Sequence, residues 1–289
     1  MHRLEPRLRI GVSTWLWTSP LTTAEAERLV PLIARMGYDC VELPLEDVAA
    51  VDAARVLRVV SDHGITATVC GAFGPGRDLT NADPRVRAAT RDYLRRCLDF
   101  AATVRAGFVA GPLYAQVGKR RPLPENERRA EWALAVEEIH GVCEDAAQRD
   151  LCIAIEPINR FETDLCNSVA DAVRMARDVD HPAARVMCDS FHMTIEESDL
   201  EAAVRSAGEL LVHVQVSENH RGVPGTGLTD WAAFARGLRA IEYRGLVVLE
   251  SFTPENQDLA GAVCIWNRRT RTQDEFAERG LEFLRRTFT

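Results

Sequence analysis

Short apolar runs alternate with longer amphipathic stretches along the whole chain. The short runs have the length and apolar content of buried β-strands; they are Arg9–Ser13, Asp39–Leu43, Ile65–Cys70, Gly107–Ala110, Leu151–Ile155, Arg185–Cys188, Leu210–His213 and Leu246–Leu249. The longer stretches have helical periodicity; they are Ala24–Met36, Ala50–His63, Pro84–Val104, Glu125–Arg149, Ser168–Asp178, Leu200–Ala207, Trp231–Ala240 and Gln273–Arg286. This strict alternation predicts one α/β domain over residues 1–289, a (β/α)₈ TIM barrel.

Residues at the ends of these stretches support the same fold. Thr23 precedes an Ala- and Glu-rich helix that Gly37 ends, and Asp83-Pro84 has the composition of a helix start. The alternative is an open, doubly wound sheet. That fold normally carries a glycine-rich dinucleotide turn after its first strand, whereas here the segment STWLW follows. The closed barrel is therefore favoured.

Four successive strands in the second half end in, or contain, a residue that can bind a metal ion. These residues are Glu156, Asp189, His213 and Glu250. Each alone also fits a helix cap, an ion pair or a buried core histidine, but strand ends of a barrel converge on one face. Three carboxylates buried together would cost several kcal/mol per charge, which a cation removes. The set predicts a carboxylate-rich site for Mn²⁺, Co²⁺ or Mg²⁺.

A second set of polar residues follows these strands in the expected βα loops. Glu162, His192 and Arg221 would lie at the mouth of the barrel, where they can reach over a bound molecule. Trp15 and Tyr114 follow earlier strands and are candidates to pack on the carbon face of a substrate, although aromatic residues also fill barrel cores.

Composition narrows the classes of partner. The net charge is −8 and Lys119 is the single lysine, so a nucleic-acid partner is not expected. No apolar stretch reaches the roughly 20 residues of a membrane span, and the first residues have no signal-peptide core. The eight cysteines form no CxxC pair and several lie in apolar runs, which is typical of reduced core residues. We expect a cytoplasmic protein that does not contact membranes.

Four segments, EPINRFE, DSFHM, VHVQVSENHRGVPGTG and ESF, resemble the signature segments of the D-tagatose 3-epimerase family. This family includes D-allulose (psicose) 3-epimerases and L-ribulose 3-epimerases and has a xylose-isomerase-like TIM barrel. The resemblance is dense over residues 150–255 and looser in the first half, where Cys70-Gly71 is similar. It implies a homodimer or homotetramer and a ketohexose or ketopentose as substrate. A free sugar is favoured over a sugar phosphate, because a phosphate would need several basic groups or a helix N-terminus.

The resemblance also implies roles for individual residues. Mn²⁺ or Co²⁺ would be bound by Glu156, Asp189, His213 and Glu250. Sugar oxygens would be held by Glu162, His192 and Arg221, and further substrate contacts would come from Phe252, Cys70 and Gly71. Inversion at C3 needs proton removal on one face and return on the other, so Glu156 and Glu250 are expected to act as the acid and base around an enediolate.

Several other functions stay open at this point. An aldose–ketose, inosose or hydroxypyruvate isomerase would use nearly the same site, and the sequence separates these from a 3-epimerase poorly. A metal-dependent DNA-repair phosphodiesterase would need further His and Asp ligands and a basic groove, which the seven histidines and the acidic charge do not indicate. A non-catalytic sugar-binding barrel would not require both Glu156 and Glu250.

Overall fold

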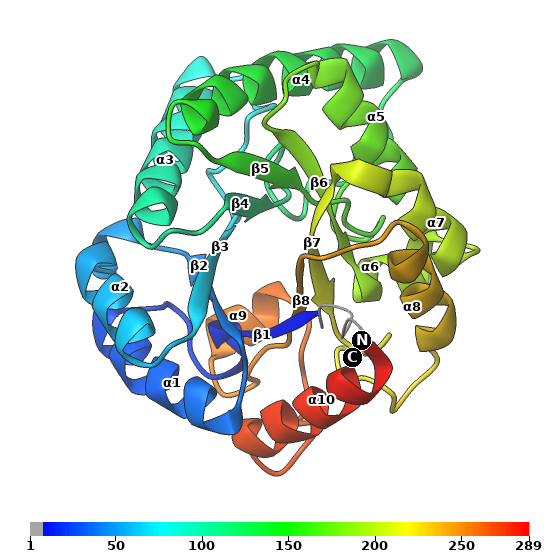
Figure 1. The fold of residues 1–289 in the computed structure, drawn as a ribbon. Coiled ribbons are helices and arrows are strands. Elements are labelled where there is room, and N and C mark those ends of the chain that lie inside the picture. The colour runs from blue at the N-terminus through cyan, green and yellow to red at the C-terminus, as the bar shows by residue number, and fades with distance from the viewer. Residues whose placement is uncertain (1–7, 289) are drawn as a thin grey trace, which may run out of the picture.

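Eight parallel strands close into a barrel in which every strand pairs with its neighbours in the chain and β8 pairs with β1 (Figure 1). The structure is a computed structural model and describes residues 8–288. The strands are β1 Arg9–Ser13, β2 Cys40–Leu45, β3 Thr66–Gly71, β4 Phe108–Gly111, β5 Cys152–Ile155, β6 Ala184–Asp189, β7 Leu211–Val216 and β8 Leu246–Leu249. The predicted closed (β/α)₈ barrel is confirmed.

The helices form a ring outside the strands, and α10 closes it between α1 and α8 (Figure 1). Their bounds are α1 Thr23–Met36, α2 Ala53–Asp62, α3 Pro84–Thr103, α4 Glu125–Ala147, α5 Val169–Val179, α6 Ser190–Glu196, α7 Leu200–Ala207, α8 Trp231–Ala240, α9 Gln257–Ala262 and α10 Gln273–Phe288. All the predicted helices are present. The short helices α6 and α9 are additional, and both lie in βα connections at the end of the barrel where strands finish.

Local capping explains where these helices begin. Thr22, rather than Thr23, caps α1 by accepting a hydrogen bond from the Glu25 N–H, and Gly37 ends that helix at φ 94°, a left-handed conformation that glycine adopts without strain. Asp83 caps α3 and Pro84 occupies its first turn, as expected from the sequence. No helix among residues 8–288 is long and apolar enough to cross a bilayer.

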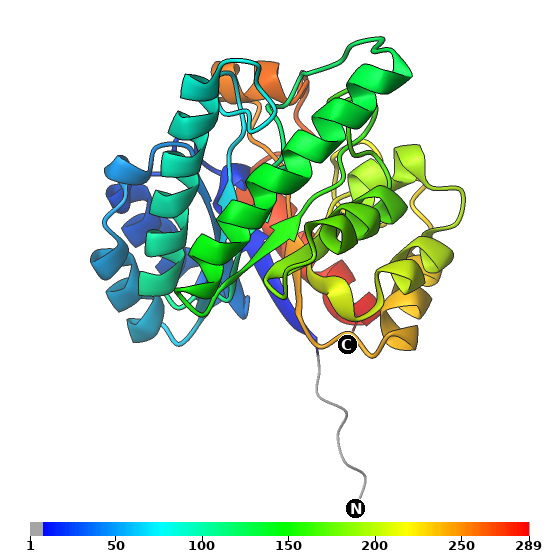
Figure 2. The ribbon, with the colours of Figure 1, turned by 90° about the horizontal axis from the view of Figure 1, so that it is seen from above.

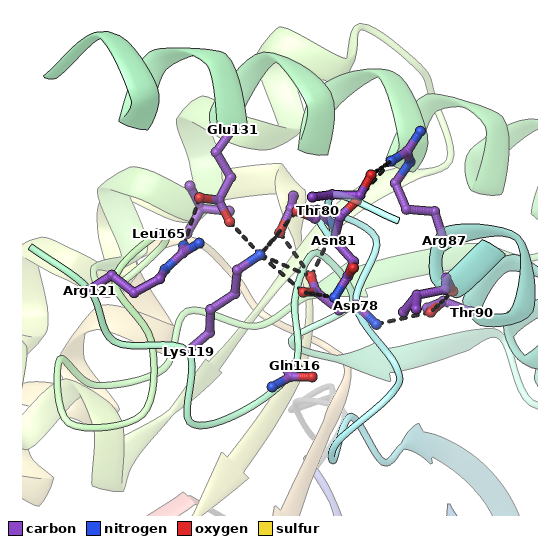
Figure 3. A network of polar contacts seen from close by, with 12 residues as sticks. Asp78, Thr80, Asn81, Arg87, Thr90, Gln116, Lys119, Arg121, Glu131 and Leu165 are labelled. Atoms are coloured by element: carbon purple, nitrogen blue, oxygen red, sulfur yellow. Dashed lines mark hydrogen bonds and ion pairs between the residues drawn. The ribbon is translucent and has the colours of Figure 1, made fainter. Parts of the chain in front are cut away.

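Lys119, the only lysine, joins the three βα loops that follow β3, β4 and β5 (Figure 3). Its ammonium nitrogen lies 3.0 Å from Asp78 Oδ2, 2.7 Å from Thr80 Oγ1 and 2.5 Å from Glu131 Oε1. Its backbone bridges to Thr163 in the loop after β5. The side chain is 10% exposed and Asp78 is 2% exposed, so this is a buried cluster that fixes the loops around one side of the barrel mouth.

We expect Lys119→Met to lower the free energy of unfolding by about 3–5 kcal/mol, because removal of the ammonium leaves the buried Asp78 carboxylate without its cation, whereas Glu131 keeps its ion pair with Arg121. Arg129→Met is the matched control: its ion pair with Glu125 is exposed, and such pairs contribute at most about 1 kcal/mol. Urea unfolding followed by circular dichroism measures both. Equal losses of unfolding free energy in the two variants would contradict the role of Lys119 in fixing the loops.

Candidate active site

A cavity of about 310 Å³ opens at the end of the barrel where the strands finish, the side occupied by α9 at the top of Figure 2. Its size is within the range of small-molecule sites. Most of the residues expected to form the site line it, namely the expected catalytic residues Glu156 and Glu250 and the expected substrate contacts Trp15, Cys70, Gly71, Glu162, His192, Arg221 and Phe252. Residues from α9 complete the wall, among them Asp258, Leu259 and Ala262.

Three carboxylates from different strands meet in the buried inner part of this site. Glu156 follows β5, Asp189 ends β6 and Glu250 follows β8, and each is at most 5% exposed. Burial, together with the negative charge of the neighbouring carboxylates, raises the pKa of Glu156 and of Asp189, and it raises the pKa of Glu250 to about 8. The site therefore holds more negative charge than its surroundings stabilise.

Arg221 is the cation that partly offsets this charge. Its Nη1 donates to Asp189 Oδ2 at 2.9 Å and to Glu250 Oε2 at 2.8 Å. The backbone of Arg221 is left-handed, at φ 58°, in a turn closed by its N–H to the Glu218 carbonyl at 2.8 Å. The Glu218 side chain in turn accepts hydrogen bonds from the Thr229 N–H and the Trp231 indole. The loop after β7 thus folds inward and brings Arg221 to the cavity.

Asn159 fixes both His192 and Glu162, and sequence reasoning did not single it out. Its side-chain amide lies 2.8 Å from His192 Nδ1 and donates to Glu162 Oε1 at 2.8 Å, while its backbone N–H donates to His192 Nδ1 at 3.1 Å. Nδ1 is therefore the acceptor, and the ring proton is on Nε2. Burial and the charge of Arg221 lower the pKa of His192 well below its ordinary value, so the ring is neutral.

Ligand atoms of Glu156, Asp189 and His192 lie within 4.8 Å of one another, a spacing that suits a metal ion. The carboxylate oxygens are available ligands. His192 is not, because its Nε2 carries the proton and points at Glu156 Oε1 and Asp189 Oδ2 from 3.6 and 3.5 Å. Glu250 lies outside this group and is joined to it through Arg221.

The position of His213 differs from the expectation of a fourth ligand. It is fully buried inside the barrel, with its ring 4.8 Å from that of Phe108. Its Nε2 lies 2.7 Å from Glu42 Oε2, a buried carboxylate on β2. Neither ring nitrogen belongs to the group of potential metal ligands found among residues 8–288. The next inward residue of β7 is Gln215, which pairs in register with Asp189.

Trp15, Phe252 and Gly71, which were expected to contact the substrate, form part of the cavity wall. Trp15 packs against Phe252 with ring centroids 5.5 Å apart, and its indole N–H donates to Glu46 at 2.6 Å. Gly71 is needed where it stands, because a Cβ there would lie 2.7 Å from the Phe73 ring. These contacts leave an apolar surface beside the carboxylates, suited to the carbon face of a sugar.

Tyr114 differs from its expected role in substrate contact. It is fully buried, does not line the cavity, and its hydroxyl lies 3.0 Å from the Glu156 carbonyl and 3.1 Å from the Cys166 carbonyl. The tyrosine therefore supports the backbone that carries Glu156. An aromatic residue after a strand does not reveal from sequence whether its ring faces the cavity or the core.

Comparison with known proteins agrees with this geometry. Residues 30–287 match the model of the xylose isomerase-like TIM barrel family. The chain is 30% identical over 284 residues to an L-ribulose 3-epimerase of Methylomonas sp. (strain DH-1), with 98% of each chain covered. It belongs to the ketose 3-epimerase family. The family resemblance read from the sequence is thereby confirmed, and so is the assignment of the protein as an isomerase of the epimerase class.

Two further relatives support this membership. A D-psicose 3-epimerase of Agrobacterium fabrum is 30% identical over 265 residues, covering 88% of this chain and 90% of the relative. The crystal structure of a D-allulose 3-epimerase from Methylomonas sp. in complex with D-allulose superposes with a TM-score of 0.91 at 29% identity, covering 98% of both chains. The similarity therefore extends over the whole barrel and both of its halves.

Proposed function

We propose that this protein inverts C3 of a free ketohexose or ketopentose, with Glu156 and Glu250 as the paired acid and base. The observation that carries the proposal is that two buried glutamates from strands β5 and β8 line one sugar-sized cavity in a chain of the ketose 3-epimerase family. Carboxylates on different parts of the barrel ring can serve opposite faces of a substrate, which inversion requires.

The carboxylate cluster fits a divalent cation. Asp189 and the two glutamates offer only oxygen ligands, and Arg221 is the one charged cation bound to them in the structure described over residues 8–288. We propose Mn²⁺ or Co²⁺, with Mg²⁺ as a further candidate, held by Glu156, Asp189 and Glu250. When bound, the cation supplies a Lewis acid at the ketose carbonyl and its neighbouring hydroxyl.

The other residues bind and orient the sugar. His192 Nε2–H and the Arg221 guanidinium, whose Nη2 lies 3.4 Å from that nitrogen, both line the cavity and are donors for the oxygens on which negative charge develops as the C3 proton leaves. Glu162 is held by Asn159 and accepts from a sugar hydroxyl. Proton removal by one glutamate and delivery by the other, from the opposite face, gives the C3 epimer.

The charges of the cavity favour a free sugar over a phosphorylated one. Besides the glutamates of the centre, Glu46 and Asp258 line the wall. Arg221 is already bound to two carboxylates and His192 is neutral, so the lining offers a phosphate no uncommitted cation within the described residues.

A substrate panel on Mn²⁺-loaded protein tests the proposal. L-ribulose, D-fructose, D-tagatose and D-allulose are incubated in D₂O and analysed by chromatography and NMR. We expect C3 epimers of at least one ketose, with deuterium incorporated at C3, and no turnover of the corresponding phosphates. Aldose products with deuterium at C2 would instead identify a 1,2-isomerase, and the absence of any turnover would reject the proposal.

Metal binding should stabilise the protein more as the pH rises. In the metal-free state the raised pKa of Glu250, about 8, lets the folded protein keep a proton that the unfolded chain releases near pH 4.3. Protonation of Glu250 therefore stabilises the folded metal-free protein. This stabilisation is complete below the pKa that Glu250 has in the unfolded chain, and it is lost as the pH rises through the pKa of Glu250 in the folded protein. Because Mn²⁺ displaces the proton, we expect its effect on Tm to grow from about pH 6 to about pH 8.5. Differential scanning fluorimetry measures it; a constant effect would contradict the prediction.

A further inference from the structure

The inward face of β7 carries two polar residues at different depths. His213 and Gln215 are two positions apart and point to the same side of the strand, and both are buried in the barrel. His213 pairs in register with Met187 and with Leu246, the first residue of β8. Gln215 pairs with Asp189. Gln215 is therefore about 6–7 Å nearer than His213 to the end of the barrel that holds the carboxylates.

Glu42 holds both of these side chains from the opposite side of the barrel interior. Its Oε2 lies 2.7 Å from His213 Nε2, and its Oε1 accepts from Gln215 Nε2 at 2.8 Å. The second hydrogen of the Gln215 amide faces Cys70 Sγ, with the nitrogen 3.9 Å from the sulfur. The amide nitrogen is thus fully used, and the carbonyl oxygen is the end of Gln215 that remains for a cation.

The two histidines near the site, His192 and His213, both make hydrogen bonds to residues other than the three carboxylates. His213 donates its Nε2–H to Glu42, and its Nδ1 is buried beside Phe108 with no hydrogen-bond partner among residues 8–288. His192 uses Nδ1 as an acceptor from Asn159 and keeps its proton on Nε2. An imidazole lone pair is therefore not directed at the carboxylate group by either ring.

We propose that the metal centre of this chain is built from oxygen donors alone, with the Gln215 carbonyl as the ligand from β7 and with Glu42 and His213 as its support. The inference rests on the proposed function and deepens it. Amide and carboxylate oxygens suit hard cations, whereas an imidazole would favour Co²⁺ and other later transition metals. The centre should therefore prefer Mn²⁺ or Mg²⁺.

Pulsed EPR on the full-length protein loaded with Mn²⁺ tests the donor set directly. A coordinated imidazole gives a ¹⁴N modulation, so we expect wild-type protein to lack it and Gln215→His to acquire it. His213→Gln keeps a donor for Glu42, and its spectrum should likewise lack the ¹⁴N modulation. An imidazole signal in wild-type protein, whether lost or retained in His213→Gln, overturns the oxygen-only centre.

Metal affinity provides a second, independent test of Gln215 as a ligand. By isothermal titration calorimetry we expect Gln215→Met to weaken Mn²⁺ binding at least about ten-fold. Gln215→His should raise the affinity for Co²⁺ relative to Mn²⁺. Unchanged Mn²⁺ affinity in Gln215→Met, with a wild-type circular dichroism spectrum, overturns the role of Gln215. Absence of Mn²⁺ binding by wild-type protein would also reject the metal-dependent function, whereas an imidazole signal would leave that function intact.

Discussion

Glu156→Gln and Glu250→Gln should each lower kcat by at least about 10³-fold, because each removes one of the two groups that exchange the C3 proton. Glutamine keeps the size of the side chain and an oxygen that can bind a cation. The fold should therefore be retained, and Mn²⁺ should still raise Tm. Steady-state kinetics on the ketose identified by the substrate panel measures the loss.

Deuterium exchange separates the two glutamates. A variant that lacks one base can still remove the proton from the epimer that presents it to the other base. We therefore expect each variant to exchange C3 hydrogen with D₂O in one epimer only, and the two variants to differ in which epimer exchanges. Glu144→Gln, an exposed carboxylate on α4, is the control and should keep wild-type activity. Substantial turnover by either active-site variant would reject the two-base scheme.

Arg221→Met should lower kcat/KM by about 10²–10³-fold, the usual loss when a buried donor to developing negative charge is removed. Arg221 is 6% exposed and contacts Asp189 and Glu250, so its loss also leaves those carboxylates without their cation. Assays are therefore made with saturating Mn²⁺ to keep the site charge balanced. Arg221→Lys should recover part of the activity, since it restores the charge but not the forked geometry.

Arg160→Met is the matched control for this effect. Arg160 lies in the loop after β5 and pairs with Glu196, but its side chain is 62% exposed and it does not line the cavity. Its loss should leave kcat/KM within about two-fold, because neither side chain of this ion pair lines the cavity. Comparable losses in the two variants would show that Arg221 acts through general stability rather than on the substrate.

The barrel was predictable because its signal repeats. Each strand is a short apolar run, and each main helix has both periodicity and an end signal such as Asp83-Pro84 or Gly37. The helices α6 and α9 span only seven and six residues, too short for helical periodicity to show. Both are defined by caps and packing in the folded protein, and Asp189 serves as the N-cap of α6.

The three carboxylates of the site could be predicted from the sequence, whereas the residue that β7 contributes could not. Glu156, Asp189 and Glu250 each stand at or just after a strand end, where parallel strands converge. On β7 two inward polar residues follow each other, and a histidine is the more familiar ligand. Which of them faces the carboxylates depends on the register with β6 and on a partner, Glu42, that is 171 residues away in the chain. Asn159 likewise acts through His192, a contact that sequence spacing does not show.

Different parts of the fold supply the charged groups and the apolar wall of the cavity. The groups proposed to react come from β5 to β8, whereas the short helix α9 contributes Leu259 and Ala262 to the cavity wall. If the proposed function holds, we expect exchange of these two side chains to reshape the space for the distal carbons of the sugar without moving any carboxylate. An engineer who wants a different chain length or stereochemistry at the distal carbons should therefore diversify this helix first.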